Sequence, residues 1–198
     1  MIALIDYKAG NLTSVRKAFG ALGAQLYTPG TADELASADA IVVPGVGHFA
    51  ATKSLGPEWI DAILGRVGEG RPLLGICLGM QWLYEGSEES PELPGLGLLN
   101  GRCYRLPANG IKIPHVGWNA LDFKRSGSIV EGVANDAQVY FTHSYVGPVT
   151  GDTVAVTTHG EPFASIVQRG HVAGVQFHPE KSGDVGLQVL RNFLSMVG

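Results

Sequence analysis

The sequence of 198 residues predicts an α/β fold of three layers, in which helices cover both faces of a central, mostly parallel sheet. In the first half of the chain, short apolar runs alternate with segments of helical periodicity, which is the rhythm of βαβ units. Residues 41–43 and 73–76 are apolar on both faces, as central strands of a parallel sheet are. In the second half, strand-like runs follow one another without long helices, which predicts an antiparallel or mixed extension.

The expected elements can be given in chain order. Helices are expected near residues 12–22, 57–67 and 185–196. The expected strands fall at residues 2–6, 24–28, 40–44, 72–77, 103–107, 139–145, 153–159, 163–168 and 172–179. Segments 86–95 and 106–114 are rich in Gly, Pro, Ser and Glu and are expected to be loops too short to divide domains. We therefore expect one domain over residues 1–198.

Composition and charge exclude several classes of protein. The net charge is −4 and the basic residues are scattered, so a nucleic-acid partner is not expected. No apolar run approaches the roughly 20 residues of a membrane helix, and the N-terminus has no basic leader, so we expect a cytoplasmic protein. Cys77 and Cys103 suit free thiols in a reducing compartment. No metal-ligand spacing is present, and neither a metal nor a cofactor is expected.

Cys77 lies in the strongest local motif, Gly75-Ile76-Cys77-Leu78-Gly79. The motif follows an apolar strand and precedes an amphipathic stretch over residues 80–85. Flanking glycines permit a sharp turn from strand to helix, which exposes the thiol at a helix N-terminus where backbone dipoles favour the thiolate. A buried structural cysteine is the alternative. The strand-turn-helix context favours a nucleophile.

The candidate base and its orienting group are His178 and Glu180, which directly follow the strand ending near Phe177. Pro179 restricts the backbone between them. A surface turn is the alternative for these three residues taken alone, and pairing with an elbow cysteine favours catalysis. His48, His143 and His171 are alternative bases, but none has an adjacent carboxylate in sequence. Cys103 lacks an elbow and is expected to be a packed strand residue.

Donors for an oxyanion are expected from two places. Pro44-Gly45-Val46-Gly47 follows an apolar strand, at the sheet edge where Cys77 is also expected. The backbone N–H groups of Gly45 and Val46, together with that of Leu78, are the predicted donors. An ordinary glycine turn is the alternative. The position one βα unit before Cys77 favours the functional interpretation.

Three motifs in order carry a family resemblance that covers essentially the whole chain: PGVGHF, GICLGMQ and FHPEKS. They resemble class I glutamine amidotransferases. The resemblance implies the flavodoxin-like form of the predicted fold, a triad of Cys77, His178 and Glu180, and hydrolysis of glutamine to glutamate and ammonia through a thioester. DYKAGNLTSV, PHVGWN and YFTHSY resemble the branch whose members deliver ammonia to a (β/α)₈-barrel cyclase subunit. In that branch the cyclase makes imidazole glycerol phosphate and an aminoimidazole carboxamide ribotide in histidine biosynthesis.

The same resemblance implies further site residues and a heterodimer with the cyclase. Gln81 and Glu89 would contact the α-amino and α-carboxylate end of glutamine, and Ser144 and Tyr145 would contribute mainly through their backbone. Four residues would face the cyclase around the mouth of an ammonia tunnel: Asn11, Trp118, Tyr140 and Lys181. Glutaminase activity in this branch is nearly silent until the partner binds its substrate, and reorientation of the strand at Gly45 and Val46 is the proposed cause.

Two other hypotheses keep the same fold. One is a glutaminase of a different pathway or a stand-alone cysteine hydrolase, which would turn over glutamine without a partner. The other is a catalytically idle module that docks a larger enzyme. The presence of Cys77, His178 and Glu180 disfavours the idle module, and the PHVGWN and DYKAGNL motifs disfavour another pathway.

Overall fold

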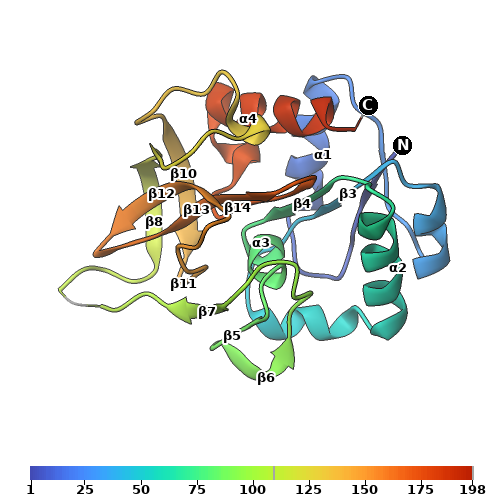
Figure 1. Ribbon diagram of the computed structural model, residues 1–198, viewed down its shortest axis with the longest axis horizontal. Coiled ribbons are helices and arrows are strands. Elements are labelled where there is room, and N and C mark those ends of the chain that lie inside the picture. The colour runs from blue at the N-terminus through green and yellow to red at the C-terminus, as the bar shows by residue number, and fades with distance from the viewer. Residues whose placement is uncertain (109, 198) are drawn as a thin grey trace.

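An eight-stranded sheet runs through the centre of the protein in the order β2-β1-β3-β4-β14-β13-β12-β9 (Figure 1). The computed structural model describes residues 1–108 and 110–197. The first five strands of that order are parallel, and the last three continue it antiparallel. In chain order their bounds are β1 Ile2–Leu4, β2 Leu26–Tyr27, β3 Ala40–Val43, β4 Leu73–Ile76, β9 Asp122–Phe123, β12 Thr153–His159, β13 Glu161–Arg169 and β14 Val172–Val175.

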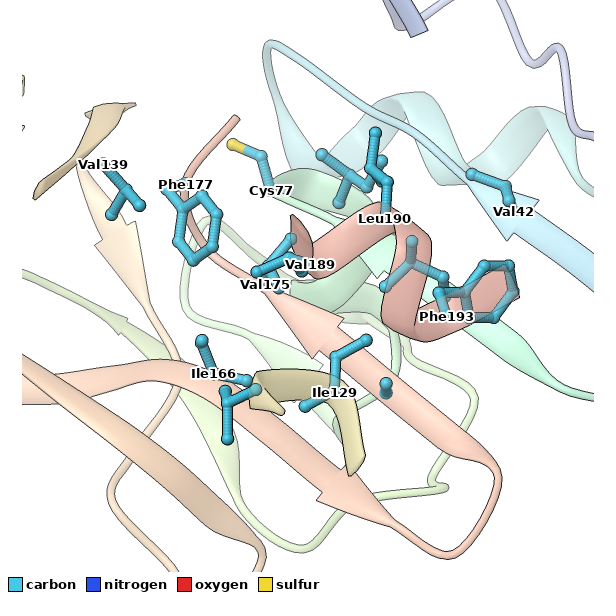
Figure 2. Packing of buried hydrophobic residues seen from close by; sticks show 14 of the residues in the cluster. Val42, Cys77, Ile129, Val139, Ile166, Val175, Phe177, Val189, Leu190 and Phe193 are labelled. Carbon is cyan, nitrogen blue, oxygen red and sulfur yellow. The ribbon is translucent and has the colours of Figure 1, made fainter. Parts of the chain in front are cut away.

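Helices cover both faces of this sheet. On one face α1 (Leu12–Ala21) and α4 (Gly183–Ser195) pack together, and on the other lies α2 (Pro57–Gly68) (Figure 1). Strand alternation divides the apolar residues between the faces: Leu4 joins the cluster under α1 and α4, whereas its neighbour Ala3 joins the cluster under α2. Figure 2 shows part of the first cluster, with Cys77 among its members. The arrangement confirms the predicted three-layer α/β fold with an antiparallel extension.

Two small sheets flank the large one. The strands β8 (His115–Ala120) and β10 (Gln138–His143) form an antiparallel pair. The other sheet has the order β11-β7-β5-β6, with bounds β5 Gly86–Ser87, β6 Ser90–Pro94, β7 Arg102–Arg105 and β11 Tyr145–Val146. The short helix α3 (Leu78–Trp82) follows β4 directly, and the 3₁₀ turns are η1 Ala32–Ser37, η2 Phe49–Ser54, η3 Ser128–Val130 and η4 Pro179–Lys181. Across the part of the chain that the structure describes, no helix combines the length and apolar character needed to cross a membrane.

Three predictions of local structure were wrong. Segment 86–95, expected to be a loop, contains β5 and β6, which pair with each other, and β5 also pairs with β7. The helix after Cys77 begins at Leu78, ends at Trp82, and is buried on every side instead of amphipathic. The single strand expected over residues 139–145 is two strands, because the chain leaves β8 at Ser144 and pairs with β7 from Tyr145 onward.

Candidate active site

Cys77 occupies a strained turn between β4 and α3. Its backbone has φ 53° and ψ −107°, a region that residues with a side chain rarely adopt. The glycine on each side of the motif is required by contact. A Cβ atom on Gly79 would lie 1.8 Å from the Val43 carbonyl oxygen, and one on Gly75 would lie 2.6 Å from the Gly79 carbonyl oxygen. The turn therefore has the form of a nucleophile elbow, with Cys77 at the N-terminus of α3.

His178 reaches the elbow because β14 is the parallel neighbour of β4. Val175 is in register with Ile76, and the Cys77 N–H donates to the Val175 carbonyl at 2.8 Å, so the two strands end side by side. The His178 Nδ1–H donates to Glu180 Oε1 at 2.9 Å, and both side chains are about 98% buried or more. That bond fixes the ring tautomer and leaves Nε2 as the free nitrogen.

The electrostatics of this pair favour a charged imidazole. Burial lowers the pKa of His178, but the Cys77 sulfur and the Glu180 carboxylate outweigh burial and raise that pKa to about 10. His178 Nε2 is buried and makes no hydrogen bond of normal geometry to any residue that the structure describes. The Cys77 sulfur is nevertheless close enough to contribute to the raised pKa of His178. The imidazolium form of His178 is therefore favoured beside the Cys77 sulfur.

Gln176 is a site residue that the sequence analysis missed. It is fully buried, and its Nε2 donates to the Cys77 sulfur at 3.5 Å. Its Oε1 accepts a hydrogen bond from Gln81 Nε2 at 3.1 Å. The only sequence signal is an amide side chain between Val175 and Phe177, at the end of a strand that is otherwise apolar.

A cavity of about 220 Å³ opens beside Cys77, and all four residues predicted to bind substrate line it. Its lining is Gly47, Cys77, Leu78, Gln81, Glu89, Pro114, Thr142, His143, Ser144 and Tyr145. Gln81 Nε2 donates to the Tyr145 carbonyl at 2.9 Å as well as to Gln176, so both amide hydrogens are used and only Oε1 is left for a ligand. Glu89 Oε2 accepts from the Phe49 N–H at 2.7 Å. Both side chains therefore present acceptors to the cavity.

The predicted oxyanion donors lie close together but differ in their hydrogen bonding. Gly45 packs against the elbow so tightly that a Cβ there would lie 2.7 Å from Leu78 Cβ. As the first residue of α3, Leu78 has an N–H that no carbonyl of its own helix accepts. The Val46 N–H, in contrast, donates to the Ala9 carbonyl at 3.3 Å. In this structure the Val46 N–H is engaged within the chain.

Comparison with known proteins identifies the family. The sequence matches the family model for Glutamine amidotransferase class-I over residues 3–197. The chain belongs to this family.

Two relatives place the chain within one group of these amidotransferases. It is 46% identical to the imidazole glycerol phosphate synthase subunit HisH of Moorella thermoacetica over an alignment of 200 residues. This alignment covers 99% of this chain and 95% of that protein. It is 42% identical over 198 residues to the protein of the same name from Methanothermobacter thermautotrophicus, covering 100% and 99%. A crystal structure described as a glutamine amidotransferase, 24% identical, aligns over 100% of both chains with a TM-score of 0.79, which shows the shared fold. The chain is thus an amidotransferase of the HisH group.

The three histidines considered as alternative bases make hydrogen bonds to groups other than Cys77. His48 is exposed, and its Nδ1 accepts from the Ala50 N–H. His171 lies before β14, at the opposite end of the strand from His178, and its Nε2 bonds the Val67 carbonyl at 2.8 Å. His143 lines the cavity, but its Nδ1 bonds the Tyr145 carbonyl at 3.1 Å and its Nε2 faces another histidine. Cys103 is fully buried in β7, as expected.

Three of the four residues expected to face a partner form one surface cluster on the amidotransferase. The Trp118 and Tyr140 rings pack edge to face, with 6.1 Å between the ring centres, and Lys181 Nζ lies 5.9 Å from the centre of the Tyr140 ring. Trp118 is 56% exposed. The fourth residue, Asn11, is the N-cap of α1, where its Oδ1 accepts from the Ser14 N–H at 3.2 Å. Within residues 1–108 and 110–197, no group of three or more His, Cys, Asp or Glu side chains is arranged to hold a metal ion.

Proposed function

We propose that this chain is a cytoplasmic glutaminase subunit that hydrolyses glutamine through a Cys77 thioester and passes the ammonia to a (β/α)₈-barrel cyclase subunit in histidine biosynthesis. The observation that carries the chemistry is the meeting of the Cys77 elbow and the buried His178–Glu180 pair at the end of two adjacent parallel strands. Both cysteines are free thiols, which suits a reducing compartment.

The reaction needs two transfers of a proton by one histidine. The Cys77 thiolate attacks the amide carbon of glutamine, and the C–N bond breaks as His178 Nε2–H protonates the leaving nitrogen to give ammonia. His178, now neutral, then takes a proton from water as that water attacks the thioester. The sulfur leaves as thiolate, His178 is again protonated, and the new carboxylic acid gives its proton to solvent as glutamate is released. Glu180 holds the ring so that Nε2 faces the reacting atoms throughout.

The polarity of the cavity indicates how glutamine would lie in it. Gln81 Oε1 and the Glu89 carboxylate are both acceptors, and together they suit the α-ammonium of an amino acid. Neither suits its α-carboxylate, for which the backbone N–H groups of the wall at Ser144 and Tyr145 are the candidates. An amino acid anchored in this way points its side-chain amide toward Cys77.

The oxyanion would be stabilised by the Leu78 N–H and, once released from Ala9, by the Val46 N–H. Losing one such donor costs other hydrolases about 10²–10³ in turnover. A chain that keeps the Val46 N–H bonded to Ala9 would accordingly be slow on its own. Gly45 and Gly47 flank Val46, and Gly47 already has φ 99°, so the peptide can turn without a side-chain clash at either neighbour.

The partner is supported by the names of the relatives and by the surface. Both relatives are named as subunits of imidazole glycerol phosphate synthase. An exposed Trp beside Tyr140 has the aromatic composition of an interface centre. Ammonia set free in water near pH 7 would be mostly protonated, and an enclosed route to a partner would preserve its nucleophilicity.

The test measures glutamate released from glutamine by the purified chain, alone and with a barrel cyclase subunit plus its nucleotide substrate, with Cys77→Ala as the blank. Strong stimulation by the pair that Cys77→Ala abolishes is the expected result. Brisk activity of the chain alone that ignores the barrel would keep the glutaminase and overturn the pathway. No activity in any mixture, from a folded chain, would favour the idle module.

A further inference from the structure

The side chain of Gln176 links the cysteine sulfur to the wall of the substrate cavity. It lies just beyond β14 and is fully buried, and its own N–H donates to the Ser165 carbonyl at 2.9 Å, which fixes the backbone from which the side chain extends. One end of the amide contacts Cys77 and the other contacts Gln81. The side-chain amide of Gln offers a neutral donor and a neutral acceptor on one planar group.

The orientation of this amide follows from its neighbours. Gln81 Nε2 is a donor to the Tyr145 carbonyl, because a carbonyl oxygen can only accept. The same nitrogen faces Gln176, so the atom of Gln176 that receives it must be Oε1. The Nε2 of Gln176 is then the atom 3.5 Å from the Cys77 sulfur. An N–H is therefore aimed at the sulfur and cannot turn away without breaking the bond to Gln81.

A donor in this position acts on one protonation state of the sulfur. A thiolate is a much stronger acceptor than a neutral thiol, and a hydrogen bond to the charged form of a group favours that form. The site is buried, where such a bond is stronger than in water. His178 already supplies one favourable interaction with the thiolate, and the Gln176 amide supplies a second that carries no charge and stays in place when His178 gives up its proton.

We propose that Gln176 is a further catalytic residue of this chain: its Nε2–H donates to the Cys77 sulfur and stabilises the thiolate, while its Oε1 keeps Gln81 in place at the cavity wall. The proposal rests on the proposed role of Cys77 as nucleophile. The amide would stabilise the thiolate before it attacks the substrate and again when the sulfur leaves the thioester. In these two steps the negative charge is on the sulfur.

The experiment measures the rate at which iodoacetamide alkylates Cys77 as a function of pH, with the labelled peptide identified by mass spectrometry. This readout needs no glutamine and no partner subunit. Gln176→Met removes the donor with little change of volume. Gln176→Glu keeps an acceptor for Gln81 but places a carboxylate beside the sulfur. Gln168→Met is the matched control, since Gln168 is also a buried glutamine but bonds Ser128, Ile129 and Gly170.

In Gln176→Met we expect the pH midpoint of alkylation to rise by about one unit, as for a lost hydrogen bond to a charged group, so that the rate below the wild-type midpoint falls about tenfold. Gln176→Glu should shift the midpoint at least as far, although it preserves the bond to Gln81, and Gln168→Met should not shift it. A role limited to holding Gln81 predicts instead that Gln176→Glu behaves like the wild type, and this would overturn the proposal. If wild-type Cys77 is not alkylated while glutaminase activity is intact, the nucleophile itself is wrong.

A measurement on the wild-type chain covers the case in which the variants do not fold. The side-chain amide resonances of Gln176 should move with pH at the same midpoint as alkylation of Cys77, and they should not do so in Cys77→Ala. Amide resonances that stay constant while the thiol titrates would overturn the proposal, since a donor bonded to sulfur must sense the change of charge.

Discussion

His115 Nδ1 lies 3.0 Å from His143 Nε2, and both rings are buried. The other nitrogen of His143 is 3.1 Å from the Tyr145 carbonyl, so it must carry a proton. His143 Nε2 is then the acceptor and His115 Nδ1–H the donor. His115 Nε2 accepts in turn from the Asn119 amide at 3.3 Å. Both histidines are therefore neutral, each in one tautomer, and they support the carbonyl that also holds Gln81.

This pair should make the fold sensitive to mild acid. Burial first, and then the neighbouring His159, lower the pKa of His115 to about 4, while burial and His115 lower the pKa of His143 to about 3. In the unfolded chain each would titrate near 6.5, so the unfolded state binds more protons as the pH falls below that value. We expect the free energy of unfolding to fall between pH 6.5 and about 4, by about 1.4 kcal/mol per pH unit from His143 alone. Urea unfolding at pH 7.0, 6.0 and 5.0 measures this slope.

The matched variant is His143→Gln. A Gln amide at this position can donate to the Tyr145 carbonyl and accept from His115, but it does not titrate. We expect the variant to fold and its slope of unfolding free energy against pH to be smaller by about 1.4 kcal/mol per pH unit. A slope equal to that of the wild type would show that His143 is not the group that takes up the proton.

Gly79→Ala tests whether the elbow tolerates any side chain at this position. The added Cβ would lie 1.8 Å from the Val43 carbonyl oxygen, which belongs to the backbone of a central strand and cannot move aside cheaply. We expect a loss of several kcal/mol, in the range of severe overpacking, or failure to fold. Gly65→Ala is the control, because Gly65 lies in α2 with no atom within 4 Å of the added Cβ, and it should stabilise by about 0.5–1 kcal/mol. Comparable unfolding midpoints for the two variants would contradict the contact.

The elements predicted well are those whose burial on both faces demands an unbroken apolar run. Residues 41–43 and 73–76 have this pattern, and both lie in the centre of the parallel sheet. Strands β5 and β6 were missed because their sequence is polar and rich in turn residues. The pairing of β5 with β7 depends on a neighbour distant in the chain, and directly after β5 the Glu88 N–H donates to the Cys103 carbonyl of β7 at 2.9 Å. A local pattern carries no information about such a bond.

The candidate active site also has features that the sequence indicates and features that only the structure reveals. The approach of Cys77 and His178 follows from two strand ends at one sheet edge, which the order of motifs already indicates. The contact of Gln176 with sulfur depends on the choice of rotamer in a packed interior. The direction of the Val46 N–H depends on one peptide orientation beside Gly45 and Gly47. The spacing of residues in the sequence predicts neither the Gln176 contact nor the direction of the Val46 N–H, so the structure was needed to find these two features.

Tyr7→Phe should loosen the segment after β3 that carries the Val46 N–H. The Tyr7 hydroxyl donates to the Pro44 carbonyl at 2.6 Å, and the Ala9 carbonyl, two residues along, accepts from the Val46 N–H, so one loop holds this segment at two points. Removing the hydroxyl costs about 1–2 kcal/mol of local stability. That would ease the turning of Val46 and raise glutaminase activity without a partner by several-fold. Glutamate release by the chain alone measures the effect.

The control for Tyr7→Phe is Tyr27→Phe. The Tyr27 hydroxyl also donates to a backbone carbonyl, that of Glu34 at 2.8 Å, but it lies away from the cavity lining. This variant should leave partner-free activity unchanged. Equal activity in the two variants would mean that the Tyr7 hydrogen bond does not restrain the segment that carries Val46.

Trp118→Ala tests the proposed partner surface. Trp118 is 56% exposed, so its removal should change the free energy of unfolding by no more than about 0.5 kcal/mol. At the centre of an interface, the same truncation costs about 2 kcal/mol or more, which is roughly a 30-fold rise in the barrel-subunit concentration that gives half-maximal glutaminase activity. Val149→Ala is the matched control, because Val149 is also an exposed apolar residue, at 50%, and is not one of the three residues of the cluster formed by Trp118, Tyr140 and Lys181. If Trp118→Ala leaves the half-maximal concentration of the barrel subunit unchanged and reaches full stimulation, the docking surface lies elsewhere on the molecule. If that concentration is unchanged but stimulation at saturation is weak, Trp118 acts in transmitting the signal and not in binding the partner.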